Sequence, residues 1–132
     1  MAPFRYNSYH KIITAIVIIG WAVFNFSGDN LSGGYYSNGQ IKRSGGFENG
    51  RNHGKWIWYY ENGQRKMEGT FKNGKRNGTW ITWDKNGNRL TQGNYEDDRL
   101  NGAFSRWDTK GNKVEHLIYK NDVLIQKLPL KE

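Results

Sequence analysis

Histidine, cysteine and clustered carboxylates are the side chains that most often carry out catalysis or bind metals, and this chain of 132 residues has few of them. It contains no cysteine and three histidines, His10, His53 and His116. His53 and His116 occupy positions at which neighbouring repeats of the chain place Asn, Glu or Gln. Positions that accept these residues face solvent, so we expect neither histidine to act as a metal ligand or as a general base.

One acidic cluster, Glu96-Asp97-Asp98, is a second candidate for binding a cation. It stands where the preceding repeat has Lys72-Asn73-Gly74, so we predict a solvated hairpin turn instead of a metal site. The glycines recur at repeated turn and strand positions, and we therefore expect no phosphate-binding glycine loop. The sequence predicts that the protein is not an enzyme and uses no cofactor and no metal.

Glycine and aromatic residues recur along the chain with a constant step of 24 residues. Two glycine columns are Gly54, Gly78 and Gly102, and Gly39, Gly63, Gly87 and Gly111. Three aromatic columns are Tyr35, Tyr59, Trp83 and Trp107; Phe47, Phe71, Tyr95 and Tyr119; and Trp56, Trp80 and Phe104. A period of this length indicates a repeat architecture, because one unit cannot bury its apolar face alone and must stack on its neighbours.

The repeat that spans residues 55–78 predicts one β-hairpin. Residues 56–60 are aromatic or β-branched, as is typical of a strand, and Asn62-Gly63 follows as a predicted type I′ turn. Residues 65–72 then alternate between packing and solvent-facing side chains, which predicts the second strand. Asn73-Gly74 and a loop over residues 75–78 return the chain to the next aromatic strand.

Two features of the pattern leave alternatives open. Gly69 recurs as Gly45 and Gly93 inside predicted strands, which indicates either a bulge or an aromatic ring lying over the backbone. The columns at Trp56 and Tyr59 are three residues apart, so either a bulge separates them or both faces of the sheet carry aromatic side chains.

The predicted fold class is all-β: a single-layer antiparallel meander of about eight strands, built from stacked 24-residue hairpins and preceded by one N-terminal hydrophobic helix. We assign residues 1–29 to a signal-anchor or transmembrane segment and residues 30–132 to the repeat domain. The repeats cover about residues 31–54, 55–78, 79–102 and 103–126. A capping strand over residues 123–128 ends before Pro129, which suits a sheet edge.

The hairpins YYENGQRKMEGTFKNGKRNGTW and WDKNGNRLTQGNYEDDRLNGAF resemble MORN repeats, specifically the bacterial variant that is often described as the antitoxin of a toxin–antitoxin pair. The resemblance covers about Leu31 to Gln126 and departs from the family pattern at Leu117, Asp122 and Gln126. It implies a twisted single-layer sheet with a scaffold or interaction role and without catalysis.

An apolar run over residues 12–26 follows Arg5, His10 and Lys11. Positive residues stay in the cytoplasm, which predicts a cytoplasmic N-terminus and a periplasmic repeat domain. Aromatic residues at both ends favour a retained transmembrane helix, whereas the run's length of about 22 Å favours a cleaved signal and secretion. The predicted span contains Ile12, Ile13, Ile16, Val17, Ile18, Ile19, Trp21, Val23 and Phe24.

The net charge is +8, and we expect basic residues of the inter-repeat loops to line one edge of the sheet. These residues are Arg51, Lys55, Lys75, Arg76 and Arg99. Such a stripe either attracts anionic lipid or an acidic glycan, or only keeps the edges soluble. An extracytoplasmic domain does not meet nucleic acid, so we expect no nucleic-acid partner.

The function that the sequence favours is a membrane-anchored scaffold that docks protein partners, as an accessory subunit of a membrane complex. Alternatives are a secreted or peripheral binding module for anionic lipid or cell-wall polymer, and an antitoxin-like protein that neutralises a toxin. One column changes between repeats, from Trp58 to Thr82 and Arg106. A protein that binds a repetitive polymer would use the same contact in each repeat, so this change disfavours polymer binding. The predicted partner-binding residues are the less repeated aromatics Tyr36, Trp58 and Tyr60 with the basic Arg51 and Lys55.

Overall fold

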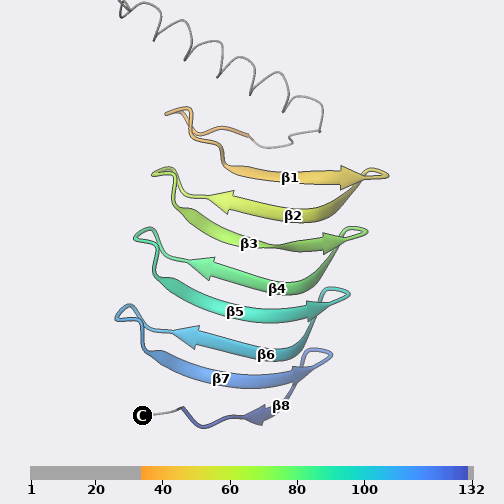
Figure 1. The fold of residues 1–132 in the computed structure, drawn as a ribbon, viewed down its shortest axis with the longest axis vertical. Helices are drawn as coiled ribbons and strands as arrows, with labels where there is room; N and C mark the ends of the chain where they lie inside the picture. Colours follow the sequence, from red (N-terminus) through yellow and green to blue (C-terminus); the bar gives the residue numbers. More distant parts are fainter. Residues whose placement is uncertain (1–33, 131–132) are drawn as a thin grey trace, which may run out of the picture. The chain divides into compact units, whose positions relative to one another are not determined.

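The computed structural model describes residues 34–130, in which eight strands form one antiparallel sheet with a strand order that follows the sequence (Figure 1). The strands are β1 (Arg43–Glu48), β2 (Arg51–Tyr59), β3 (Arg65–Lys72), β4 (Lys75–Trp83), β5 (Arg89–Glu96), β6 (Arg99–Trp107), β7 (Lys113–Lys120) and β8 (Val123–Lys127). The predicted all-β single-layer meander is confirmed. The predicted N-terminal helix, its membrane span and the boundary at residue 29 lie outside the described residues.

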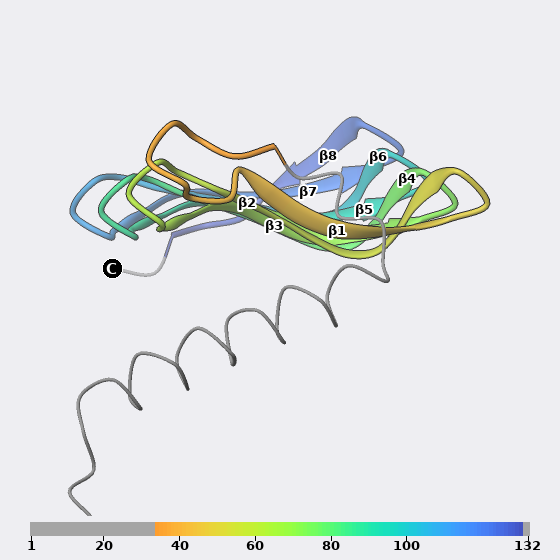
Figure 2. The ribbon, with the colours of Figure 1, turned by 90° about the horizontal axis from the view of Figure 1, so that it is seen from above.

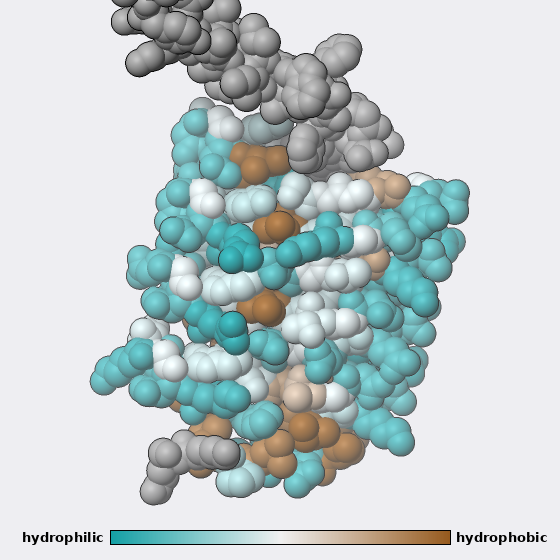
Figure 3. Space-filling model, viewed as in Figure 1, coloured by the Kyte–Doolittle hydropathy of each residue, from teal (hydrophilic) through white to brown (hydrophobic). Residues whose placement is uncertain are grey.

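Residues 34–130 form a single layer and contribute no second layer over the sheet, as the view from above shows (Figure 2). Trp56 and Trp80, at 2% and 6% exposure, are the only buried hydrophobic side chains between residues 34 and 130. One face of the sheet has polar residues along both turn edges and apolar residues gathered over the C-terminal strands (Figure 3). Among residues 34–130, no helix has the length and hydropathy of a membrane span.

Each of the two buried tryptophans packs its ring onto a glycine of the preceding strand. A Cβ atom added at Gly45 would lie 2.1 Å from Cδ2 of Trp56, and one added at Gly69 would lie 2.1 Å from Cδ2 of Trp80. At Gly93 the added Cβ would lie 3.0 Å from Phe104. The strand glycines therefore leave room for a ring to lie over the backbone. The strand pairing also shifts register at these positions, so both predicted alternatives hold.

The two kinds of turn differ from the prediction. Asn73 and Gly74 both have positive φ, 51° and 80°, as a type I′ turn requires. At the other turn edge only Gly63 has positive φ, 84°, and its N–H donates to the Tyr60 carbonyl at 3.0 Å. The prediction of a type I′ turn at Asn62-Gly63 is wrong. A type I′ turn needs positive φ at two successive residues, and this longer turn has it at Gly63 and not at Asn62.

The predicted loop over residues 75–78 is also wrong, since these residues begin strand β4 and only two residues separate it from β3. Between the Trp56 and Tyr59 columns, the pairing of β2 with β3 shifts register after Trp58. A bulge therefore separates these columns. The first predicted hairpin retains only an isolated bridge between Tyr35 and Ile41 ahead of β1, whereas the last predicted strand is present as β8.

Candidate functional site

Two of the three aromatic columns pack together on one face of the sheet. Trp58, which belongs to neither column, lies beside them. We call this surface the aromatic face, and its rings belong to Phe47, Trp56, Trp58, Phe71, Trp80, Tyr95, Phe104 and Tyr119. Two pairs of these rings meet edge to face, with centroids 5.3 Å apart for Phe47 and Trp56 and 4.9 Å apart for Phe71 and Trp80. Such edge-to-face pairs are favourable beyond the area they bury, so a chain of rings connects strands β1 to β5, and Phe104 and Tyr119 connect β6 with β7.

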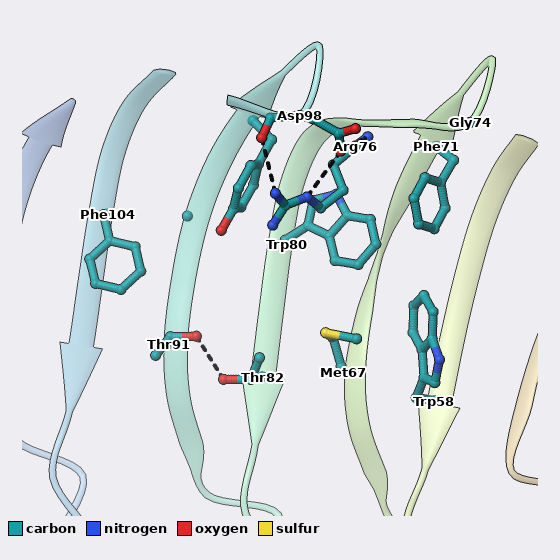
Figure 4. Close-up of a pocket in the computed structure, with 12 residues that line it drawn as sticks. Trp58, Met67, Phe71, Gly74, Arg76, Trp80, Thr82, Thr91, Asp98 and Phe104 are labelled. Carbon is teal, nitrogen blue, oxygen red and sulfur yellow. Dashed lines mark hydrogen bonds and ion pairs between the residues drawn. The ribbon is translucent and has the colours of Figure 1, made fainter. Parts of the chain in front are cut away.

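A groove of about 390 Å³ runs across the aromatic face from β2 to β6 (Figure 4). Trp58, Phe71, Trp80 and Phe104 supply its aromatic walls, and polar groups of β4 and β5 lie between them. Grooves of this size that combine aromatic rings with a few polar groups are typical binding sites. The groove is therefore the candidate docking site.

One row of side chains crosses the groove and changes its chemistry from repeat to repeat. We call it the variable row: Trp58, Met67, Thr82, Thr91, Arg106 and Glu115. Each member is the cross-strand neighbour of the next, from β2 to β7. Directly paired residues lie on the same face of a sheet, so the row forms one continuous line. It is apolar at Trp58, neutral and polar at Thr82, and charged at Arg106.

The groove exists because the variable row loses its large ring after the first full repeat. Trp58 contacts Trp80 with ring centroids 5.7 Å apart, whereas the repeat-equivalent Thr82 has only a small side chain. The hydroxyl groups of Thr82 and Thr91 lie 2.6 Å apart and hydrogen bond to each other (Figure 4). Because residues 34–130 place no second sheet above this layer, removing a ring leaves an open hollow that the two threonines do not fill.

Arg76 and Asp98 close the groove at the edge of the type I′ turns. The Arg76 guanidinium lies 4.1 Å from the centre of the Tyr95 ring, and its Nε donates to Oδ1 of Asp98 at 3.1 Å. The same Oδ1 accepts the Arg76 backbone N–H at 2.8 Å, and these bonds, followed by the positive charge of Arg76, lower the pKa of Asp98. This edge of the groove is therefore a fixed ion pair.

The charged end of the variable row is also an ion pair. Nε of Arg106 donates to Oε2 of Glu115 at 3.0 Å, and this hydrogen bond lowers the pKa of Glu115 and raises that of Arg106. Both groups remain ionised at neutral pH. A partner that lies along the row meets an indole ring at one end and a charged pair at the other.

The structure does not bring the five predicted partner-binding residues into one patch. Trp58 lines the groove, but Lys55 lies on the opposite face, where its Nζ is 3.7 Å from Glu68. Arg51 is exposed and packs beside Gly74 at the turn edge. Of these three residues, Trp58 alone belongs to the groove.

Tyr36 and Tyr60 take part in packing between the hairpins. The Tyr36 hydroxyl donates to the Tyr59 carbonyl at 3.0 Å, and the Tyr60 hydroxyl donates to the Trp83 carbonyl at 2.8 Å. The premise that the repeat geometry has no use for these rings is therefore wrong. In later repeats Asp84 takes the same position and accepts N–H bonds within its own turn.

The five residues of the predicted basic stripe fall into two groups in the structure, two in ion pairs and three at the starts of strands. Arg76 is paired with Asp98 and Lys55 with Glu68, and Arg51, Lys75 and Arg99 begin strands instead of standing in loops. His53 lies 3.2 Å from Glu48 across the first type I′ turn. Within residues 34–130, no three acidic or histidine side chains are grouped as a metal site requires.

Met67, Thr91 and Arg76 were not among the predicted site residues. The signal for Met67 and Thr91 was present in the sequence, since the column of Met67, Thr91 and Glu115 changes from repeat to repeat as the Trp58 column does. Only the strand register shows that these two varying columns face each other.

The repeated hairpins are the part of the chain that matches a known protein family. The family model described as MORN repeat variant matches residues 52–73 and 76–97, which begin in β2 and β4 and end in or just after β3 and β5. The protein is a MORN repeat protein. The comparison with curated proteins gives no match for this chain. In this MORN repeat protein the matched hairpins contribute most of the groove, from Trp58 to Tyr95.

Proposed function

We propose that this MORN repeat protein is a membrane-anchored, extracytoplasmic scaffold that docks a protein partner in the groove of its aromatic face, as an accessory subunit of a membrane protein complex. The variable row carries the proposal. Repeated columns on both sides of it keep the hairpins stacked, and the row itself changes from Trp58 to Arg106. A surface that differs at every step offers one binding register to a folded or extended protein segment.

The same row argues against a repetitive ligand. A cell-wall polymer presents identical units, and a protein that reads it needs the same contact in each repeat. Here the equivalent positions hold Trp58, Thr82 and Arg106, which cannot make the same contact. A protein segment with an apolar end toward Trp58 and a polar end toward the Arg106–Glu115 pair fits the row.

One matched pair of variants tests the docking site. Thr82→Arg places a long charged side chain in the groove, and Thr70→Arg makes the same change on the opposite, solvent-facing side of β3. In a quantitative pull-down from mild detergent, Thr82→Arg is expected to reduce partner capture at least tenfold, and Thr70→Arg to leave it within about twofold. Equal capture by both variants would show that the partner binds elsewhere.

Anchoring and orientation rest on the sequence alone, because Arg5 and Lys11 precede the apolar run over residues 12–26. Protease added to spheroplasts is expected to digest the repeat domain, while the mature protein keeps its Met1 peptide. Protection of the repeats would refute the orientation. An N-terminus near Val23 would refute a retained anchor and favour the secreted alternative.

A further inference from the structure

A second hollow, of about 300 Å³, adjoins the groove at its Trp58 end. Trp58 lines both spaces, and the residues around the second hollow include three basic side chains and no acidic one. We call this hollow the basic pocket, and its charged residues are Lys42, Arg43 and Lys66. A partner segment that packs on Trp58 therefore comes beside three positive charges.

Arg43 extends the variable row by one strand. It is the cross-strand neighbour of Trp58, and its repeat column continues as Met67, Thr91 and Glu115. Directly opposite residues of an antiparallel pair lie on one face, with Cα atoms about 4.5–5.5 Å apart. An extended chain rises about 3.3 Å per residue, so the basic pocket lies about one or two residues beyond the residue of a docked segment that contacts Trp58.

The two lysines of the pocket lie over aromatic rings. Nζ of Lys42 is 5.2 Å from the centre of the Tyr36 ring, and Nζ of Lys66 is 5.6 Å from the centre of the Tyr60 ring. Within residues 34–130, neither ammonium group forms an ion pair with a carboxylate. A ring attracts a cation but carries no net charge, so both positive charges remain available to a ligand.

The repeated fold does not require these lysines. Their column continues as Leu90 and Val114 in the later repeats, where the column of the two tyrosines continues as Asp84 and Asp108. An aspartate thus occupies the tyrosine column only where the lysine is absent. A lysine beside such a carboxylate is a common surface ion pair, and the first two repeats do not use it. Stacking of the hairpins therefore does not explain why the pocket is basic.

We propose that the basic pocket binds carboxylate side chains of the protein segment that docks in the groove. This partner segment carries Asp or Glu about one or two residues beyond the apolar residue that covers Trp58. The proposal rests on the proposed docking function and names the chemistry of the partner at one end. Charge complementarity supports it, because a basic segment is repelled here and a neutral one leaves three cations without a counter-charge.

An oriented peptide library tests the proposal. Each immobilised peptide has a fixed central Leu with randomised positions on both sides, and the probe is the full chain in mild detergent. The wild type is expected to select Asp or Glu over Lys or Arg about tenfold near the Leu. The double variant Lys42→Glu, Lys66→Glu is expected to reverse this selection. The matched control Lys85→Glu, Lys110→Glu makes the same charge change in exposed turns and is expected to select as the wild type does.

Thr82→Arg separates this proposal from the docking function on which it rests. If Thr82→Arg abolishes peptide binding but the wild type has no preference for acidic peptides, the docking function stands and the proposal is overturned. If Thr82→Arg binds the library as the wild type does, both are overturned. The proposal also fails if the wild type binds no peptide, or if the control reverses the selection, because net charge would then be the cause. A reversed preference cannot come from a variant that has failed to fold.

Discussion

The fit of each tryptophan over a strand glycine can be tested by adding a single carbon atom. In Gly69→Ala the new Cβ would lie 2.1 Å from Cδ2 of the Trp80 ring, well inside the closest contacts that Cβ atoms make. The ring must move outward by more than 1 Å, on the order of the difference from an ordinary contact of about 3.5 Å. That movement breaks the bond from Trp80 Nε1 to the Thr70 carbonyl, now 3.2 Å long.

The expected cost follows from the contacts that are lost. A lost hydrogen bond costs about 1 kcal/mol, and the edge-to-face contact with Phe71, at 4.9 Å between centroids, is worth about 1 kcal/mol. Overpacking adds about 1–3 kcal/mol, and the reduced entropy of the unfolded chain returns about 0.5 kcal/mol. We therefore expect Gly69→Ala to lower the free energy of unfolding by about 3 kcal/mol. This corresponds to a fall in Tm of at least about 10 °C for a domain of this size.

Gly93→Ala is the matched control, because Gly93 holds the same position one repeat later. Its added Cβ would lie 3.0 Å from Phe104 and 3.1 Å from Leu100, so these side chains need to move by only a few tenths of an ångström. The Phe104 ring, unlike the Trp80 indole, also has no N–H group whose hydrogen bond could be lost. We expect a cost below about 1 kcal/mol in urea denaturation followed by circular dichroism. Equal costs for the two variants would refute the reasoning that the ring packs on the glycine.

Three further predictions concern the turns and the links between hairpins. Gly63→Val should cost about 1–3 kcal/mol, because Gly63 has φ of 84°, and Lys66→Val should cost less; equal melting temperatures would contradict this. Tyr60→Phe should cost about 1 kcal/mol in denaturant unfolding, because its hydroxyl donates to a carbonyl of the next repeat at 2.8 Å; a cost near zero would show that water replaces the bond. The lowered pKa of Asp98 means that its ionised carboxylate stabilises the fold above about pH 4, and this contribution is lost as the pH falls below that value. The difference in Tm between Asp98→Asn and the wild type should therefore be largest near pH 7 and shrink below pH 4, and a pH-independent difference would rule out the ion pair as its source.

The sheet could be predicted because the residues that form it are repeated. Period-two alternation over residues 65–72 gives strand β3 with its observed bounds, and the recurrence of Gly69 indicates a ring over the backbone. The turns were less predictable, since Asn62-Gly63 and Asn73-Gly74 are the same dipeptide in two different turns. Loop length and register decide between these turns, and neither can be measured from the dipeptide.

The candidate site was predicted only in part, because it depends on which strand residues face each other. Trp58 was predicted from its absence in later repeats, and it does line the groove. Tyr60 was predicted by the same argument, yet its hydroxyl binds a neighbouring carbonyl, a role that Asp84 replaces with bonds inside its own turn. Variation between repeats therefore marks both the candidate groove and a change in how the turns are held.

Photo-cross-linking from the groove tests the central claim, that this MORN repeat protein docks a protein partner on its aromatic face, most directly. A photoreactive phenylalanine derivative at Met67 would lie in the groove, and the same derivative at Thr70 would lie on the other face of β3. In cells that express the full chain, irradiation is expected to link the Met67 derivative to one protein and to give at least tenfold less product from Thr70. Cross-links that form equally from both positions, or only from Thr70, would contradict the account.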